Sequence, residues 1–162
     1  MRLLIVTVLS IFSFISCAFK SRPKEPMVYY SYHAGNGYAL WSEKFSAKLQ
    51  NDGSVELVYG YTHDMSAEEY GDTIVVDISA LKHIEEIYIE HKIYKYKERY
   101  ESPFFVTDGD SWGSTSMFGK DSSKKEIIST GGYESWPKDD GLSQINNYIR
   151  SFFPKKNNQI EE

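Results

Sequence analysis

A stretch of alternating apolar and polar residues constrains the fold of this chain more than any other feature. Between Tyr38 and Gln50 the apolar residues Trp41, Phe45, Ala47 and Leu49 alternate with the polar residues Ser42, Lys44, Ser46 and Lys48. This period of two is typical of a strand with one face on a core and the other in water. Asn51-Asp52-Gly53 then supplies the left-handed backbone positions that a tight hairpin needs. The alternation resumes at Val55, Leu57, Tyr59 and Tyr61. The sequence therefore predicts an antiparallel hairpin over this region.

Further strands are expected on both sides of this hairpin. Met27–Tyr32 precedes it and Thr73–Val76 follows it after a polar loop. A second hairpin is predicted over Trp112–Phe118 and Glu126–Thr130, across the polar connection Gly119–Lys125. Because the connections are short, antiparallel pairing is favoured.

Two segments instead show helical spacing. The first carries Leu81, Ile84, Ile87, Tyr88 and His91 after a possible cap at Asp77 or Ser79. The second carries Leu142, Ile145, Ile149 and Phe152 after Asp139 and Asp140, and it ends at Pro154. We expect an α+β fold: a twisted antiparallel sheet of about five strands with two helices packed on one face, in the order β-β-β-α-β-β-α. One domain over residues 27–153 and a disordered tail over 154–162 complete the expected organisation.

The first 26 residues have the layout of an export signal and a tether. Met1-Arg2 gives a positive start, and the apolar run Leu3–Ile15 is shorter than the about 20 residues that a membrane-spanning helix needs. A signal peptide over residues 1–16 is predicted, with Ser16 at the cut, followed by a polar tether over residues 17–26. An N-terminal transmembrane anchor and a leader that is cut elsewhere are the alternatives.

Cys17 is the only cysteine of the chain. Disulfides within the chain and zinc sites built on thiolates are therefore excluded. Phe14-Ile15-Ser16-Cys17 resembles the lipobox of bacterial lipoproteins, in which a small residue precedes a cysteine that becomes the acylated mature N-terminus. The segment departs from the usual pattern at Phe14, where Leu is commonest, and at Ile15, where a small residue is commonest. Looser lipoboxes of this kind occur in Bacteroidetes-like bacteria. The resemblance implies lipidation (palmitate) at Cys17 and a lipid anchor in the cell envelope, with the outer membrane favoured, so that the domain faces the periplasm or the exterior.

The charge of the chain argues against nucleic acid as a partner. The formal net charge is −5, and an acidic chain is repelled by phosphate backbones. The single cluster of positive charge comprises Lys92, Lys95, Lys97 and Arg99, and it is interleaved with Glu90, Glu98 and Glu101. Such a run is typical of a solvated face.

The sharpest candidate for catalysis is Gly109-Asp110-Ser111-Trp112-Gly113, which fits the G-x-S-x-G elbow of serine hydrolases. That elbow needs a helix after the serine, but the pattern of residues 114–118 indicates a strand. In the order of such hydrolases the histidine follows the serine, whereas His33, His63, His83 and His91 all precede Ser111. We therefore assign no catalytic residue and expect a protein that is not an enzyme.

The other candidate sites fail for similar reasons. Gly113–Lys120 has one residue too many for a phosphate-binding loop. Asp108 and Asp110 resemble the first two ligands of a calcium loop, but Trp112 stands at the third. His83 and His91 are eight residues apart, a spacing that does not match two metal ligands on one helix. We expect His83 to be a surface residue and His91 to be a cation at the helix end. No metal and no cofactor is predicted.

Aromatic residues are the remaining candidates for a site. Core packing is the expected role of Trp41 and Trp112, which lie within strands. Tyr133 and Trp136 flank a predicted turn beside Gly131-Gly132 and Pro137, so we expect them to project from the sheet as binding residues.

Asp108-Gly109-Asp110-Ser111-Trp112, Gly132-Tyr133 and Trp136-Pro137 together resemble a pattern in small lipoproteins and lone domains of gut-type bacteria. The resemblance covers about the last third of the chain and implies the two-layer fold, with no activity attached. The resulting hypothesis is a non-enzymatic envelope lipoprotein that binds another envelope protein or an extracellular ligand. A glycan-binding accessory lipoprotein is the first alternative and an envelope serine hydrolase the second.

Overall fold

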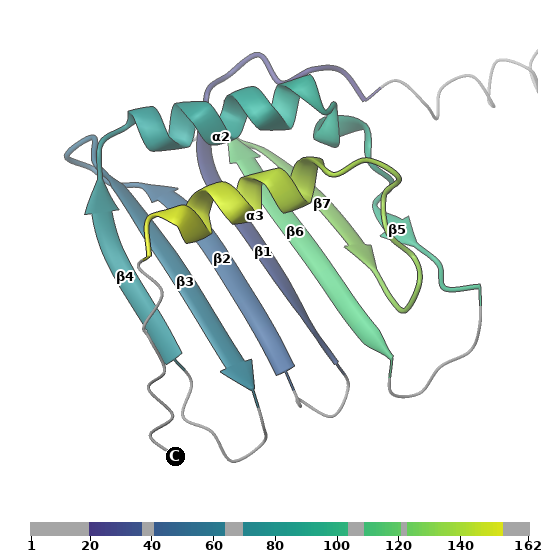
Figure 1. The fold of residues 1–162 in the computed structure, drawn as a ribbon. Coiled ribbons are helices and arrows are strands. Elements are labelled where there is room, and N and C mark those ends of the chain that lie inside the picture. Colours follow the sequence, from purple (N-terminus) through teal and green to yellow (C-terminus); the bar gives the residue numbers. More distant parts are fainter. Residues whose placement is uncertain (1–19, 37–40, 64–69, 104–108, 121–122, 154–162) are drawn as a thin grey trace, which may run out of the picture.

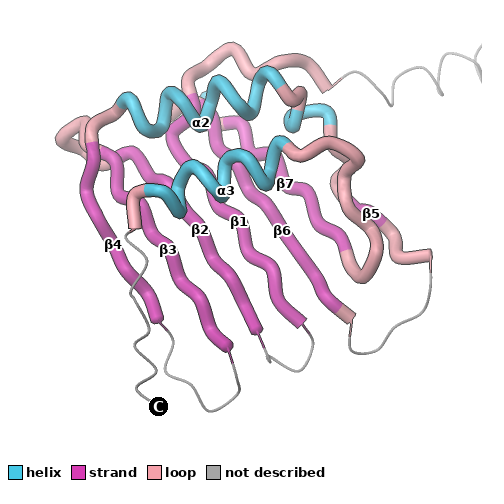
Figure 2. The backbone as a smooth tube through the Cα atoms, viewed as in Figure 1, coloured by secondary structure: helices cyan, strands magenta, loops and turns pink. Residues whose placement is uncertain are grey.

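In a computed structural model of the chain, the described residues are 20–36, 41–63, 70–103, 109–120 and 123–153. They form a seven-stranded sheet with two α-helices on one of its faces (Figures 1 and 2). The α+β class and the placement of both helices on one face are therefore as predicted.

The strand order across the sheet is β4-β3-β2-β1-β6-β7-β5. The strands before the first helix are β1 (Met27–Asn36), β2 (Trp41–Leu49), β3 (Val55–His63) and β4 (Tyr70–Val76). Those after it are β5 (Arg99–Tyr100), β6 (Asp110–Phe118) and β7 (Lys125–Gly131). The helices are α2 (Ser79–Glu90), the 3-10 turn η1 (Ile93–Lys95) and α3 (Gly141–Ser151).

Both predicted hairpins are confirmed. Leu49 on β2 pairs with Val55 on β3, and Gly53 in the turn between them has a φ of 88°, in the left-handed region that favours glycine. In the second hairpin Phe118 on β6 pairs with Lys125 on β7.

The sheet is larger than the expected five strands, and it is mixed. Four strands precede α2, and β5 pairs in parallel with β7 through Arg99 and Thr130. The prediction of a purely antiparallel sheet is wrong at this edge. A two-residue strand is too short to show any alternation, and tertiary pairing alone defines it.

The centre of the sheet is a long-range pairing. β1 lies between β2 and β6, and its Tyr32 is opposite both Phe45 and Ser114. The β1–β6 pairing joins the two hairpins into one sheet, so that both share one core.

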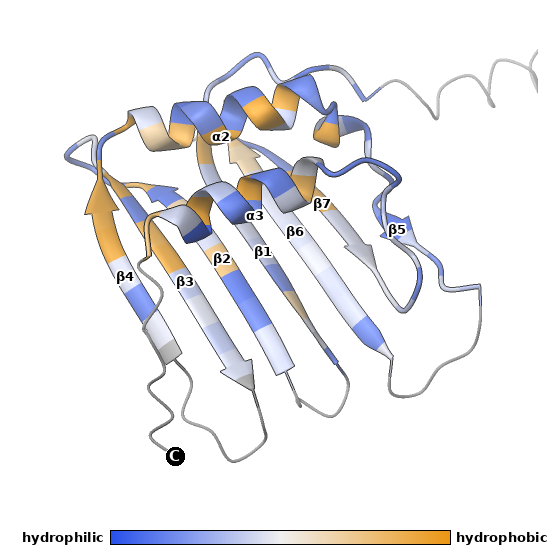
Figure 3. Ribbon diagram, in the orientation of Figure 1, coloured by the Kyte–Doolittle hydropathy of each residue, from blue (hydrophilic) through white to orange (hydrophobic). Residues whose placement is uncertain are grey.

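On the helix-facing side of the sheet, the side chains differ in type and polarity between the two ends of the strands. We call the end where β1 begins the tether end and the end where β1 finishes the far end (Figure 1). A row near the tether end consists of Ile74, Leu57, Ala47, Tyr30, Ser116 and Ile127. A row near the far end consists of Tyr61, Glu43, Ala34, Trp112 and Gly131. Apolar colour accordingly gathers near the tether ends of the strands and on the helices (Figure 3).

Both helices bury the faces that their spacing predicts. In α2 the Asp77 carboxylate accepts a hydrogen bond from the backbone N–H of Ser79 at 2.9 Å, in keeping with the expected cap. The buried residues of α2 are Ala80, Leu81, Ile84, Ile87 and Tyr88. Those of α3 are Gly141, Leu142, Ile145, Asn146 and Ile149.

The described part of the tether lies against the domain. Lys20 Nζ donates to the backbone oxygen of Tyr96 at 2.5 Å, and Lys125 Nζ donates to that of Ser21 at 3.2 Å. The backbone oxygen of Pro26 accepts from Gly119 N at 3.0 Å. The predicted leader, Cys17 and the predicted tail lie outside the described residues, and none of the described helices is long and apolar enough to span a membrane.

Candidate functional site

Two tryptophans stack at the far end of the sheet. Trp112 of β6 is 1% exposed, and Trp136, from the loop between β7 and α3, is 44% exposed. Their ring centroids are 5.4 Å apart and their planes differ by 16°. The predictions that Trp112 is buried and that Trp136 projects from the sheet are therefore confirmed. Trp41, also expected in the core, is only partly buried and packs against it.

The turn that carries Trp136 is built around Trp112. Trp112 Nε1 donates to the backbone oxygen of Ser135 at 3.0 Å, and the Ser135 hydroxyl bridges N and O of Gly132 at 2.7 Å each. A Cβ on Gly131 would lie only 2.3 Å from Trp112 Nε1, so the backbone approaches the indole as closely as a glycine permits. Trp136 is thus supported by a rigid base.

Trp136 forms one wall of a hollow of about 300 Å³. Residues of β1, β2, α3 and the loop before α3 line it together. The other lining residues are Tyr32, Glu43, Pro137, Asp139, Asp140, Leu142, Ser143, Asn146, Asn147 and Arg150. Tyr133 is 40% exposed but does not line this hollow. The structure therefore places only one of the two predicted binding residues there.

An ion pair forms part of the lining of the hollow. Arg150 Nη2 lies 2.8 Å from Glu43 Oε1, and Arg150 Nη1 donates to Asn147 Oδ1 at 2.9 Å. The guanidinium also lies over the ring of Phe45, 5.1 Å from its centroid. These contacts hold planar polar groups, with oxygen and nitrogen atoms side by side, at fixed positions on α3 and β2.

Tyrosine hydroxyls complete the polar lining. Burial and the charge of Glu43 raise the pKa of Tyr32 well above its usual range, so this hydroxyl keeps its proton as a donor. Beneath the hollow, the buried Tyr30 hydroxyl donates to Asn146 Oδ1 at 3.0 Å. This bond fixes the side-chain amide of Asn146.

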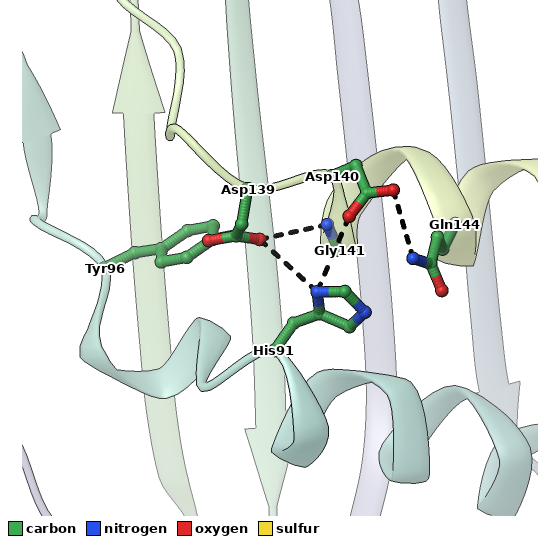
Figure 4. A network of polar contacts seen from close by, with 6 residues as sticks. All are labelled: His91, Tyr96, Asp139, Asp140, Gly141 and Gln144. Carbon is green, nitrogen blue, oxygen red and sulfur yellow. Dashed lines mark hydrogen bonds and ion pairs between the residues drawn. The ribbon is translucent and has the colours of Figure 1, made fainter.

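A polar network fixes the start of α3 next to the hollow (Figure 4). Asp139 accepts from the Tyr96 hydroxyl and from Gly141 N at 3.0 Å. His91 Nδ1 lies 3.7 Å from both Asp139 Oδ1 and Asp140 Oδ1, and Gln144 donates to Asp140 Oδ2 at 3.1 Å. The hydrogen bond from Gln144 is the main reason that the pKa of Asp140 is lowered.

His91 follows the last residue of α2, where it was predicted to act as a helix-end cation, and it connects the end of α2 to the start of α3. His83 is half-exposed, lies 3.1 Å from Glu86 and packs against Tyr148. Among the described residues no group of three or more His, Cys, Asp or Glu side chains is placed to hold a metal ion.

Ser111, the candidate nucleophile, lies in β6 on the sheet face away from the helices. The register places Ser111 opposite Gly35 and places Gly113 opposite His33, and a Cβ on Gly113 would lie 2.4 Å from the His33 ring. Ser111 and His33 are thus diagonal neighbours on one face. Within the described parts of the chain, no hydrogen bond joins them and no carboxylate orients His33. The residues after Ser111 continue β6, as the sequence predicted, and supply no helix N-terminus for an oxyanion.

The other rejected motifs also lie in regular structure. Most of Gly113–Lys120, the segment compared with a phosphate-binding loop, belongs to β6. Asp110 is the first residue of β6. Asp108 lies outside the described residues.

The sequence reasoning missed Tyr32, Glu43, Asn147 and Arg150. Glu43 could have been identified from the sequence, because it lies at an odd-numbered, core-facing position of β2 where the alternation predicts an apolar residue. Its partner Arg150 is 107 residues away in the chain, so their pairing depends on how α3 packs on the sheet. No family model matches this chain, and no curated protein matches it.

Proposed function

We infer that this chain is a non-enzymatic lipoprotein of the cell envelope, cut before Cys17 and anchored by lipid, whose domain binds a ligand in the hollow beside Trp136. The observation that carries the binding role is the placement of Trp136. A large aromatic ring that is 44% exposed, yet fixed on a buried partner, faces a cavity lined by fixed polar groups. A few convergent polar groups beside an apolar wall are typical of a ligand site.

The arrangement of the domain supports this inference. The tether leads to the start of β1 (Figures 1 and 2), whereas the sheet residues that line the hollow are Tyr32, past the middle of β1, and Glu43, near the start of β2. None of the described tether residues lines the hollow, so a lipid on Cys17 would leave the hollow open to a ligand.

A glycan is the ligand class that the lining favours over a protein partner. Sugar rings combine a C–H face, which stacks on an aromatic ring, with hydroxyls that bond to paired oxygen and nitrogen atoms. Trp136 offers the ring, and Glu43, Asn147 and Arg150 offer the paired polar atoms. A protein partner would favour a convex apolar patch instead.

The binding role is tested on a panel of immobilised polysaccharides with the full chain in mild detergent. We expect retention on at least one polysaccharide, and Trp136→Ala to abolish it. Tyr133→Ala is the matched control, because Tyr133 is equally exposed on the same turn but lies outside the hollow. Equal loss in both variants, or in neither, would place binding elsewhere on the domain.

The anchor is tested separately by metabolic labelling. Labelled palmitate should enter the wild-type protein and not Cys17→Ala, because Cys17 is the only cysteine. An unlabelled wild-type protein that is soluble in the periplasm would show that the anchor is absent.

The hydrolase alternative has one supporting observation, the shared face of Ser111 and His33. A fluorophosphonate probe is expected to leave the folded protein unlabelled. Stoichiometric labelling that disappears in Ser111→Ala would establish the enzyme instead.

A further inference from the structure

The two edges of the sheet are built differently. One edge is β5, which has two residues and is flanked by Lys97 and Pro103. The other is β4, which has seven residues, Tyr70–Val76. Within the described part of the chain no strand pairs with the outer side of β4 (Figure 1).

Sheet edges are usually protected against pairing with other chains. Short strands, lysines, prolines and bulges serve this purpose, and the β5 edge shows three of these four. β4 contains no Lys, Arg or Pro, and its one charge is Asp72. Val75 on β4 is 66% exposed, the largest value among the large hydrophobic residues described. β4 thus has the features of an edge that pairs.

We propose that two copies of this chain pair antiparallel through β4, with Thr73 opposite Thr73 of the second copy, and so join their sheets into one. This inference is independent of the ligand in the hollow and of the lipid anchor. The partner class is a second copy because the strand is complementary to itself in this one register.

Three features select the register. Centring the pair on Thr73 is the only symmetric choice that pairs all seven residues of β4. It places Val75 of each copy opposite Gly71 of the other, where a Cβ position has no atom within 4 Å and room remains for a side chain. It also places two threonines face to face, a favourable cross-strand pair.

Neighbouring registers are less favourable. Centring on Asp72 would bring two carboxylates opposite each other, and like charges in directly opposed positions destabilise a sheet. Centring on Ile74 would leave Tyr70 and Gly71 of each copy unpaired, so Val75 would lose its place beside Gly71. The self-complementary strand therefore predicts one specific geometry.

Single cysteines test this geometry. In the full chain carrying Cys17→Ser, kept in mild detergent, an added Thr73→Cys introduces the only thiol. Directly opposed residues of an antiparallel pair have Cα atoms about 4.5–5.5 Å apart, within the about 4.4–6.8 Å that a disulfide requires. Mild oxidation should convert most of Thr73→Cys to a covalent dimer.

Val75→Cys is the matched control for the register. It lies on the same face of the same strand, but the two copies of residue 75 would be more than about 12 Å apart at about 3.3 Å per residue. Its cross-linked fraction should be at least tenfold lower than that of Thr73→Cys. Equal cross-linking of the two variants, or more from Val75→Cys, would overturn the register and with it the proposal.

Sedimentation measures the pairing without a cross-link. The wild-type chain should have twice the monomer mass, and Val75→Lys should have the monomer mass because it puts a charge on the edge. Ile128→Lys is the control, since Ile128 is 43% exposed on an inner strand of the same face, and it should stay dimeric. A monomeric wild type, a dimeric Val75→Lys, or pairing of β4 with a different protein would each overturn the proposal.

Discussion

The tether end and the far end of the helix-facing sheet surface use different chemistry. Near the tether end, Leu57, Ala47 and Tyr30 lie under the helices, and all three are fully buried. Near the far end, the core-facing position of β2 is occupied by the charged Glu43 instead of an apolar residue. The loop that carries Trp136 contributes to this end together with α3. The difference indicates that stability is concentrated at one end of the domain and recognition at the other. Trp112 is the main exception, because this large side chain lies at the far end and is fully buried.

The largest expected effect tests that exception. Trp112→Ala should lower the free energy of unfolding by about 3–5 kcal/mol, because it leaves a cavity under Tyr100 and Trp136 and removes the bond to Ser135. Leu57→Ala at the tether end is the comparator, with an expected loss of about 2–5 kcal/mol. Urea denaturation of both variants measures the losses. A loss below about 1 kcal/mol for Trp112→Ala would show that the far end contributes little to stability.

The tether end should also be sensitive to alkaline pH. Burial raises the pKa of Tyr88 to about 12, although Ser116 partly opposes the shift. Because the folded state disfavours the phenolate, this stabilisation is complete below pH 10 and is lost as the pH rises through about 12. A shift of about two units corresponds to roughly 2–3 kcal/mol. Tyr30 shifts in the same direction, chiefly because it is buried.

Tyr88→Phe separates this effect from general alkaline damage. The variant should show a smaller loss of stability between pH 9 and pH 12 than the wild type, measured by urea denaturation at each pH. Tyr133→Phe is the control, because Tyr133 is exposed and distant from the core, and it should behave as the wild type does. An unchanged slope in Tyr88→Phe would mean that other groups cause the alkaline unfolding.

The sequence predicted the tether end well and the far end poorly. The alternation in β2 and β3 and the stripes of α2 and α3 are local patterns, and they identified the buried residues before any tertiary contact was known. The hollow depends on contacts between distant residues, such as Glu43 with Arg150, which no local period records. Trp136 was found because the glycines and proline of its turn are local signals. The β1–β6 pairing and β5 left no such signal.

The ion pair of the hollow should matter less for stability than for binding. Arg150 and Glu43 have side chains that are 40% and 24% exposed, and pairs of this kind contribute about 0–1 kcal/mol. Arg150→Met loses the guanidinium that lies over Phe45 but retains an unbranched apolar side chain at this position, so its unfolding free energy should fall by less than about 1 kcal/mol. Retention on a polysaccharide identified from the panel should fall at least tenfold, because the fixed polar atoms are lost. A large stability loss would place the pair among the core interactions of the tether end.

The smallest effect on stability is expected at Trp136, and it tests the comparison most directly. Trp136→Ala removes a ring that is 44% exposed and stacked on one face only, so the unfolding free energy should fall by at most about 1 kcal/mol. Trp112 fluorescence should shift to longer wavelength because its ring gains contact with water. If Trp136→Ala instead cost as much as Trp112→Ala, the two rings would form one core unit. The far end would then serve stability, and the main reason to place a glycan beside Trp136 would be gone.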